Sequence, residues 1–281
     1  MNWRLKCVAF QILEYLPGGG RLYRFAQKFV TGNHLFEVTD AYLGLHQFHV
    51  AQYRRVHPGR ALEFGGGRHF LSPLLLSNAG ATEVLVYDIQ RLSSPEQVNH
   101  TIRQLRGRVP GEWTEIDSWA DLERKYRIRY LAPGDARNTG LSDGSISFFC
   151  STSTLEHIPS PDIRQILNEC RRIAMPGAVF SNIIDYSDHY RYADDSISLF
   201  NFYLYSERRW RWFNPSNHYQ NRLRHSDFDK IFRELNWNII ETKTGTVSPD
   251  TIRTISPDPL FLRYDTADLL TSIGYFVLSA A

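Results

Sequence analysis

Cysteine is scarce in this chain of 281 residues, and its three cysteines, Cys7, Cys150 and Cys170, lie far apart. No two of them form a Cys-x-x-Cys pair, so neither a disulfide framework nor a thiolate zinc site is indicated. Such sparing use of cysteine is typical of proteins in a reducing compartment. We therefore expect a cytoplasmic protein.

Long apolar runs and an excess of charge are missing as well. No uninterrupted apolar stretch approaches the roughly 20 residues that span a bilayer. The net charge is only +2, from 32 basic and 30 acidic residues, so the global positive field of nucleic-acid-binding proteins is absent and we expect no nucleic-acid partner. What the chain has is a hydrophobic content of 42%, with 17 Phe and 15 Tyr, which is ample for a large core.

One stretch combines the signals of a strand, a tight turn, a helix and a second strand. Glycines in such a turn let a ligand approach backbone N–H groups, and an acid that closes the second strand can accept hydrogen bonds from ribose hydroxyls. The pattern therefore predicts a nucleotide-binding α/β unit. Its parts are the apolar run 60–64 with Glu63, the glycines Gly65, Gly66 and Gly67, the helical pattern 70–76, and the apolar run 84–87 that ends at Asp88.

Two further motifs extend this unit. Gly134-Asp135-Ala136 follows a third short strand, and residues 141–154 lead into Leu155-Glu156-His157. With these motifs, residues 59–186 resemble the class I S-adenosylmethionine (SAM)-dependent methyltransferases, although His69 stands where the family's third glycine is usual. The resemblance implies an α/β fold with a Rossmann-like sheet that is mostly parallel and has an antiparallel last strand.

The resemblance also implies which residues hold the cofactor SAM. The glycine turn and the acid before it would surround the methionine part, the acid after the second strand would hold the ribose, and the residues after the third strand would border the adenine. The set predicted for the cofactor is Glu63, Gly65, Gly66, Gly67, Asp88, Ile89, Asp135, Ala136 and Ser151.

The end of the predicted fifth strand carries the candidates for catalysis. The carboxyl ends of parallel strands line the ligand crevice, and Asp185, Asp188 and His189 follow this strand. A histidine beside an acid can take a proton from a substrate hydroxyl, because its pKa lies near neutrality. We predict that His189 is the general base, oriented by Asp185 or Asp188, and that His157 is a further candidate. A divalent cation bound by Asp185, Asp188 and His189 is the alternative, although we expect no metal site.

Residues 186–225 form an insertion rich in aromatic and arginine side chains. Such side chains suit sugars, aromatic rings and anionic groups, so the insertion is predicted to build the acceptor site. A purely structural aromatic cluster is the alternative. The residues predicted to bind the acceptor are His218, Tyr219, Arg222 and Arg224.

Residues 1–58 are predicted to form a helical N-terminal extension or lid, and residues 59–281 the SAM-binding domain with its insertion. The extension should contain a helix over residues 1–16 and another over Arg21–Val30. Aromatic stripes with basic flanks favour helices packed on the core, with peripheral membrane contact as the alternative. His46 and His49 lack neighbouring acids at a matching spacing, so a structural role is favoured over metal binding.

These patterns together predict a SAM-dependent methyltransferase that methylates an oxygen of a small glycosyl, aromatic or anionic acceptor. An NAD-dependent oxidoreductase is one alternative, because an acid about 20 residues beyond the glycines also suits that cofactor. A non-catalytic SAM-binding scaffold subunit is the other. Two measurements would separate these hypotheses: which cofactor raises the melting temperature of the protein, and whether bound SAM is turned over with an acceptor.

Overall fold

A seven-stranded sheet forms the centre of the computed structural model, which describes residues 2–19, 22, 35–253 and 255–280. The strand order is β3-β2-β1-β4-β5-β7-β6, and only β7 runs antiparallel to its neighbours. The predicted mostly parallel sheet with an antiparallel last strand is therefore confirmed. The strands are β1 (Arg60–Phe64), β2 (Glu83–Tyr87), β3 (Ile128–Leu131), β4 (Ile146–Thr152), β5 (Ala174–Asp185), β6 (Trp237–Thr246) and β7 (Thr271–Ala280).

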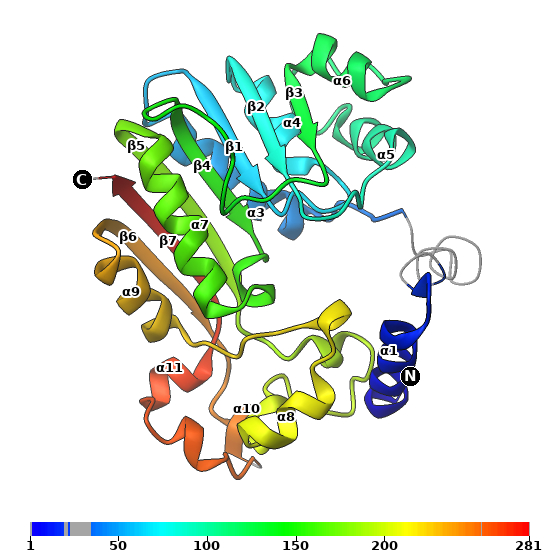
Figure 1. Ribbon diagram of the computed structural model, residues 1–281, viewed down its shortest axis with the longest axis vertical. Helices are drawn as coiled ribbons and strands as arrows, with labels where there is room; N and C mark the ends of the chain where they lie inside the picture. The colour runs from blue at the N-terminus through cyan, green and yellow to red at the C-terminus, as the bar shows by residue number, and fades with distance from the viewer. Residues whose placement is uncertain (1, 20–21, 23–34, 254, 281) are drawn as a thin grey trace.

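Helices cover both faces of this sheet (Figure 1). Side chains of successive strand residues point to opposite faces, so Ala61 packs with α3 to α6, whereas Leu62 packs with α7 and α9. Burial on both faces explains why the inner strands are almost continuously apolar. The main helices are α1 (Trp3–Tyr15), α3 (Asp40–Tyr53), α4 (Leu71–Asn78), α5 (Pro95–Leu105), α6 (Trp119–Tyr126), α7 (Ser160–Ile173), α8 (Glu207–Phe213) and α9 (His225–Glu234), with the short α10 (Asp250–Arg253) and α11 (Thr266–Leu270).

A second hydrophobic core lies beyond the carboxyl ends of the strands. It belongs to a small lobe, which we define as residues 3–15, 186–220 and 247–270 (Figure 1). Three sequence segments far apart in the chain thus share one core. Its buried members are Trp3, Cys7, Phe10, Tyr190, Phe200, Phe202, Tyr203, Trp210 and Phe261.

The two helices of the N-terminal region contact different parts of the molecule. α1 packs on the rest of the small lobe, where the backbone N–H of Trp3 donates to Asp194 Oδ2 at 2.9 Å. α3 packs on α4 and on the strands β4 and β5. The helix predicted over Arg21–Val30 lies outside the described residues. Within the described residues, α1 and α3 thus pack on different surfaces.

His46 and His49 of α3 are both buried against the sheet. Nδ1 of His49 lies 2.7 Å from Ser181 Oγ, and its Nε2 lies 2.9 Å from Thr152 Oγ1. Nδ1 of His46 lies 2.5 Å from Ser72 Oγ. These hydroxyl partners join α3 to β4, β5 and α4, as expected of histidines with a structural role.

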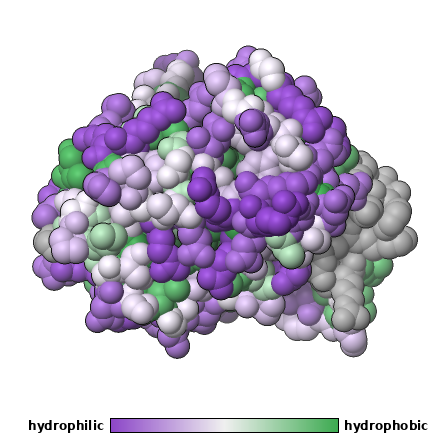
Figure 2. All heavy atoms as spheres, turned by 90° about the horizontal axis from the view of Figure 1, so that it is seen from above, coloured by the Kyte–Doolittle hydropathy of each residue, from purple (hydrophilic) through white to green (hydrophobic). Residues whose placement is uncertain are grey.

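The outer surface is mostly polar where Figure 2 shows it. Hydrophilic side chains cover most of that face, with apolar ones scattered among them. None of the described helices is long and apolar enough to cross a bilayer.

Candidate functional site

A cavity of about 430 Å³ opens at the carboxyl ends of β1, β2 and β4. Loops after neighbouring parallel strands meet at this edge of the sheet, so residues far apart in sequence share one wall. The lining includes six of the nine residues predicted for the cofactor, namely Gly65, Gly67, Asp88, Ile89, Asp135 and Ala136. Glu63, Gly66 and Ser151 are not among the lining residues.

Two glycines of the turn after β1 admit no larger residue without rearrangement. Gly65 has a φ of 71°, and a Cβ placed on it would lie 2.3 Å from the Thr154 side chain. A Cβ on Gly66 would lie 2.3 Å from Cγ1 of Val86. The turn therefore packs close to β2 and to the loop after β4, which leaves its backbone at the cavity.

Asp88 holds this turn against the end of β2. Its Oδ2 accepts a hydrogen bond from the backbone N–H of Gly67 at 3.3 Å, and its Oδ1 accepts from Gln90 N–H at 3.4 Å. Burial raises the pKa of Asp88 to about 6, against the lowering effect of these N–H groups. The carboxylate faces the cavity and has acceptor capacity left for a ligand's hydroxyl groups.

Glu63 lies beneath the same turn and is 3% exposed. Within the described part of the chain, its Oε2 has no hydrogen-bond partner. Burial raises the pKa of Glu63 to about 8, and the nearby Asp88 adds to the shift against a hydrogen bond with Ser72. A carboxylate in this position is suited to a ligand that carries a positive charge.

The remaining predicted cofactor residues differ in how they meet the cavity. Arg137 pairs with Asp135 at 2.8 Å, which lowers the pKa of that carboxyl group and fixes it at the rim. Ile89 is 68% exposed, so an apolar side chain is available to cover a ligand. Ser151 is fully buried in β4, and its Oγ is without a partner among the described residues.

His189 lies beside the cavity, at the start of a short 3-10 helix after β5. Its Nε2 is 3.3 Å from Asp185 Oδ2, and Asp185 also accepts hydrogen bonds from Ser187 and Tyr192. Burial tends to raise the pKa of Asp185, but the neighbouring imidazole of His189 and the hydrogen bonds from Ser187 and Tyr192 outweigh it and lower the pKa to about 2. Asp185 is thus an anionic partner that can fix the orientation and tautomer of His189.

Asp188 is oriented differently from Asp185. Its carboxylate accepts hydrogen bonds from the backbone N–H of Tyr190 at 2.9 Å and from Asn201 Nδ2 at 3.1 Å. It is fully buried, and burial raises its pKa to about 6. Asp188 therefore caps the 3-10 helix that carries His189, and Asp185 rather than Asp188 is the acid that faces the imidazole.

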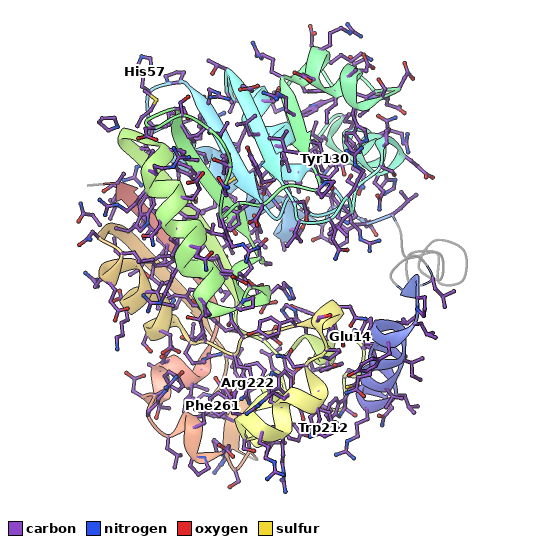
Figure 3. All side chains as sticks on the ribbon, viewed as in Figure 1. Glu14, His57, Tyr130, Trp212, Arg222 and Phe261 are labelled. Atoms are coloured by element: carbon purple, nitrogen blue, oxygen red, sulfur yellow. The ribbon has the colours of Figure 1, made fainter. Side chains whose placement is uncertain are left out.

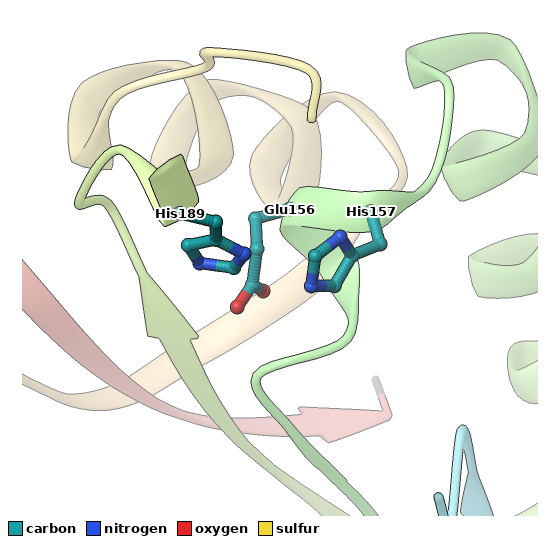
Figure 4. A group of neighbouring side chains, drawn as sticks. All are labelled: Glu156, His157 and His189. Atoms are coloured by element: carbon teal, nitrogen blue, oxygen red, sulfur yellow. The ribbon is translucent and has the colours of Figure 1, made fainter. Parts of the chain in front are cut away.

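Glu156 and His157 complete this group from the short 3-10 helix Leu155–His157 after β4 (Figure 4). The rings of His157 and His189 have centroids 4.7 Å apart. Glu156 is 2% exposed, and its Oε1 accepts a hydrogen bond from Asp185 N–H at 3.4 Å. Burial, and then the charge of Asp185, raise the pKa of Glu156 well above its usual range. Sequence reasoning did not include Glu156 among the site residues, although it stands within the Leu-Glu-His motif.

The predicted acceptor arginines are structural in their contacts. Arg222 is 5% exposed and donates to the carbonyl oxygen of Phe202 at 3.2 Å and to Glu207 Oε2 at 2.5 Å. Arg224 is fully buried and donates to the carbonyl oxygens of Tyr186 and Thr271. Figure 3 shows Arg222 inside the small lobe. Neither arginine lines the cavity, and carbonyl and carboxylate groups of the protein occupy both guanidinium groups, so the structure does not support their predicted role in acceptor binding.

His218 and Tyr219 link the small lobe to the site in another way than predicted. His218 stacks on Phe10 of α1, with ring centroids 4.8 Å apart. The carbonyl oxygen of Tyr219 accepts a hydrogen bond from His157 Nδ1 at 2.8 Å. Tyr219 also lines a groove of about 630 Å³ between α1 and α8, together with Tyr15, Arg208, Arg211 and Trp212.

Comparisons with known proteins agree with this geometry. Residues 98–181 match a family model described as a methyltransferase domain. No curated protein matches the chain. Among solved structures, a phosphoethanolamine N-methyltransferase 2 from Haemonchus contortus, in complex with phosphomonomethylethanolamine and S-adenosylhomocysteine, is similar at a TM-score of 0.51 and 13% identity. That match covers 91% of this chain and 56% of the other.

A second similar structure is a geranyl diphosphate methyltransferase in complex with GPP and sinefungin. Its TM-score is 0.50 at 11% identity, over 85% of this chain and 77% of that one. Identities this low show a shared fold. The family model and the fold thus agree on the same class of protein.

Proposed function

We infer that this chain is a class I SAM-dependent methyltransferase, because it carries a methyltransferase domain within the mostly parallel sheet typical of that class. Its cavity fits the cofactor. The carboxylate of Asp88 suits the ribose hydroxyls, and the unpaired carboxylate oxygen of buried Glu63 suits a cation such as the methionine ammonium group. This pairing of a diol acceptor with a buried carboxyl group under one glycine turn is the observation that carries the proposal.

The transferred group passes to an oxygen of a small acceptor. Bound SAM supplies an electrophilic methyl group, and the protein has to align the acceptor with it and remove one proton. His189 is the residue on which proton removal depends. Asp185 lies beside Nε2 of the His189 ring and favours the tautomer that carries its proton there. Nδ1 of the ring then keeps its lone pair and can take the proton of the acceptor.

The acceptor enters between the cavity and the small lobe. Tyr219 borders the groove between α1 and α8 and also contacts His157, which lines the cavity. The groove presents Arg208, Arg211 and the 72% exposed Trp212. Arginine forks and an exposed indole ring suit a glycosyl or aromatic acceptor that carries an anionic group.

The proposal is tested by calorimetric titration of the protein with SAM and with S-adenosylhomocysteine. We expect binding to the wild type and its loss in Asp88→Ala, because no other described carboxylate holds Gly67 and faces the cavity. Asp143→Ala is the matched control, since that side chain is 80% exposed and its ion-pair partner among the described residues is Arg172 alone. His189→Ala should bind SAM normally and lose methyl transfer. Failure of the wild type to bind either compound would refute the inference.

A further inference from the structure

Three side chains from two loops converge beside the cofactor cavity (Figure 4). Glu156, His157 and His189 each offer one ligand atom, and these atoms lie within 4.8 Å of one another. Around a tetrahedral ion with bonds of about 2.1 Å, ligand atoms are roughly 3.4 Å apart, so a shift of about 1 Å closes the set. Because His157 is exposed, its side chain has room for such a shift.

Each imidazole has a partner behind it that leaves one ring nitrogen for a ligand. Nδ1 of His157 donates to the carbonyl oxygen of Tyr219 at 2.8 Å, so Nε2 carries the lone pair, and Figure 4 shows that nitrogen turned toward Glu156. His189 has Asp185 at its Nε2, 3.3 Å away, which leaves Nδ1. A carbonyl or carboxylate behind each histidine is the usual support of metal-binding imidazoles.

The carboxylate of the group has an unused oxygen. Glu156 is 2% exposed, and its Oε2 has no hydrogen-bond partner within the described part of the chain. An unpaired oxygen on a buried carboxylate is costly unless a cation or donor meets it. In Figure 4 this carboxylate points into the space between the two imidazole rings.

We propose that Glu156, His157 and His189 bind a divalent transition-metal ion of the zinc type. Two imidazoles and one carboxylate are the ligand set of several catalytic zinc sites, whereas Mg²⁺ prefers oxygen ligands alone. The site differs from a cation held by Asp185, Asp188 and His189, because Asp188 is engaged by Tyr190 and Asn201.

The inference rests on the proposed function and refines how the acceptor loses its proton. An ion with three protein ligands keeps one position open for the acceptor's oxygen and lowers the pKa of that oxygen. The proton passes to solvent, the oxygen forms its bond to the methyl carbon, and the bond from carbon to sulfur breaks to leave S-adenosylhomocysteine. With the ion bound, the lone pair of His189 is a ligand rather than the proton acceptor.

The experiment is a titration of the full chain, freed of metal by a chelator that is then removed, with Zn²⁺ and separately with Mg²⁺. We expect one equivalent of Zn²⁺ to bind and Mg²⁺ not to bind. His157→Ala should weaken zinc binding by more than about 100-fold, because even a lost supporting partner costs 10- to 100-fold. His57→Ala is the matched control, since His57 is also exposed, has its Nδ1 3.1 Å from a carbonyl oxygen, and lies at the far end of the molecule (Figure 3).

Circular dichroism of each variant separates lost binding from lost folding, and Glu156→Gln gives a second, nearly isosteric test. Zinc affinity unchanged in His157→Ala, or an equal loss in His57→Ala, would overturn the proposal, as would binding of Mg²⁺ at the same site. Because the metal-free protein is titrated with SAM in a separate experiment, a failure of the methyltransferase inference is seen independently of zinc binding.

Discussion

At the scale of single residues, the cofactor cavity depends on a carboxyl group that the fold buries without a full set of partners. Glu63 is 3% exposed, and burial raises its pKa to about 8 from the ordinary value of 4.5. The folded chain therefore keeps a proton that the unfolded chain releases above about pH 4.5. Binding of a cationic ligand would favour the ionised form, so cofactor binding and deprotonation of Glu63 are expected to be coupled.

This coupling gives a prediction for the pH dependence of stability without cofactor. Because the folded-state pKa of Glu63 is raised, the contribution of Glu63 to the free energy of unfolding is most favourable below pH 4.5. This contribution falls by about 1.4 kcal/mol per pH unit as the pH rises toward 8. Glu63→Gln should remove this loss of stability. The difference in melting temperature between the variant and the wild type should therefore grow from pH 4.5 to pH 8. Thermal melts at several pH values measure it. Glu123→Gln, whose side chain is 58% exposed, is the control, and parallel profiles for Glu63→Gln and wild type would contradict the assignment.

At the scale of elements, the segment between α8 and α9 joins the small lobe to the sheet. Asn221 N–H donates to the carbonyl oxygen of Glu156 at 2.8 Å, and its Nδ2 donates to those of Leu155 and Ile158. Arg224 adds hydrogen bonds to carbonyl oxygens at the end of β5 and the start of β7. These contacts hold the 3-10 helix of Glu156 and His157 in place.

Variants of Arg224 and Arg211 test which arginine stabilises the fold and which one binds the acceptor. Arg224→Ala leaves several buried carbonyl groups unpaired and should lower the free energy of unfolding by about 3 kcal/mol or more. Arg211→Ala removes an exposed groove residue, so its melting temperature should stay near that of the wild type while its KM for the acceptor rises. Melting curves compare the two variants. A stable Arg224→Ala with a raised acceptor KM would return Arg224 to the acceptor site.

The strand and turn motifs were more predictable from the sequence than the insertion. The local sequence predicts the fold of residues 60–88, because apolar runs, glycines and terminal acids each have a fixed place in a strand-turn-helix unit. The insertion folds as short 3-10 helices and coil. Its apolar residues therefore show no regular period from which buried and exposed side chains could be distinguished. The sequence therefore predicts Arg222 and Arg224 as ligands for an acceptor, although aromatic rings and carbonyl groups surround them in the fold. The sequence does not indicate that the Glu156 side chain lies buried beside Asp185, because that contact joins the loops after two different strands.

At the scale of the whole molecule, two hydrophobic cores meet at the site. The larger core consists of two clusters, one on each face of the sheet, and supports the cofactor cavity, whereas the small lobe has its own aromatic core. α1 belongs to the second core, although nearly two hundred residues separate it in sequence from its partners there. The small lobe is therefore closed by the N-terminal helix, and the acceptor groove between α1 and α8 exists only when α1 is docked.

Trp3→Ala tests whether the core of the small lobe supports the acceptor groove but not the cofactor cavity. The Trp3 ring packs on Tyr190 and Phe213, with centroids 5.3 and 5.0 Å away, and its truncation should cost about 3–5 kcal/mol of local stability. We expect faster proteolysis within residues 3–15 and weaker acceptor turnover, with unchanged SAM affinity, because the cofactor cavity is supported by the larger core. Leu5→Ala, on the same helix but 67% exposed, should change none of these. A fall in SAM affinity that parallels the gain in proteolysis would mean that both cores unfold as one unit, and that docking of α1 supports the whole molecule.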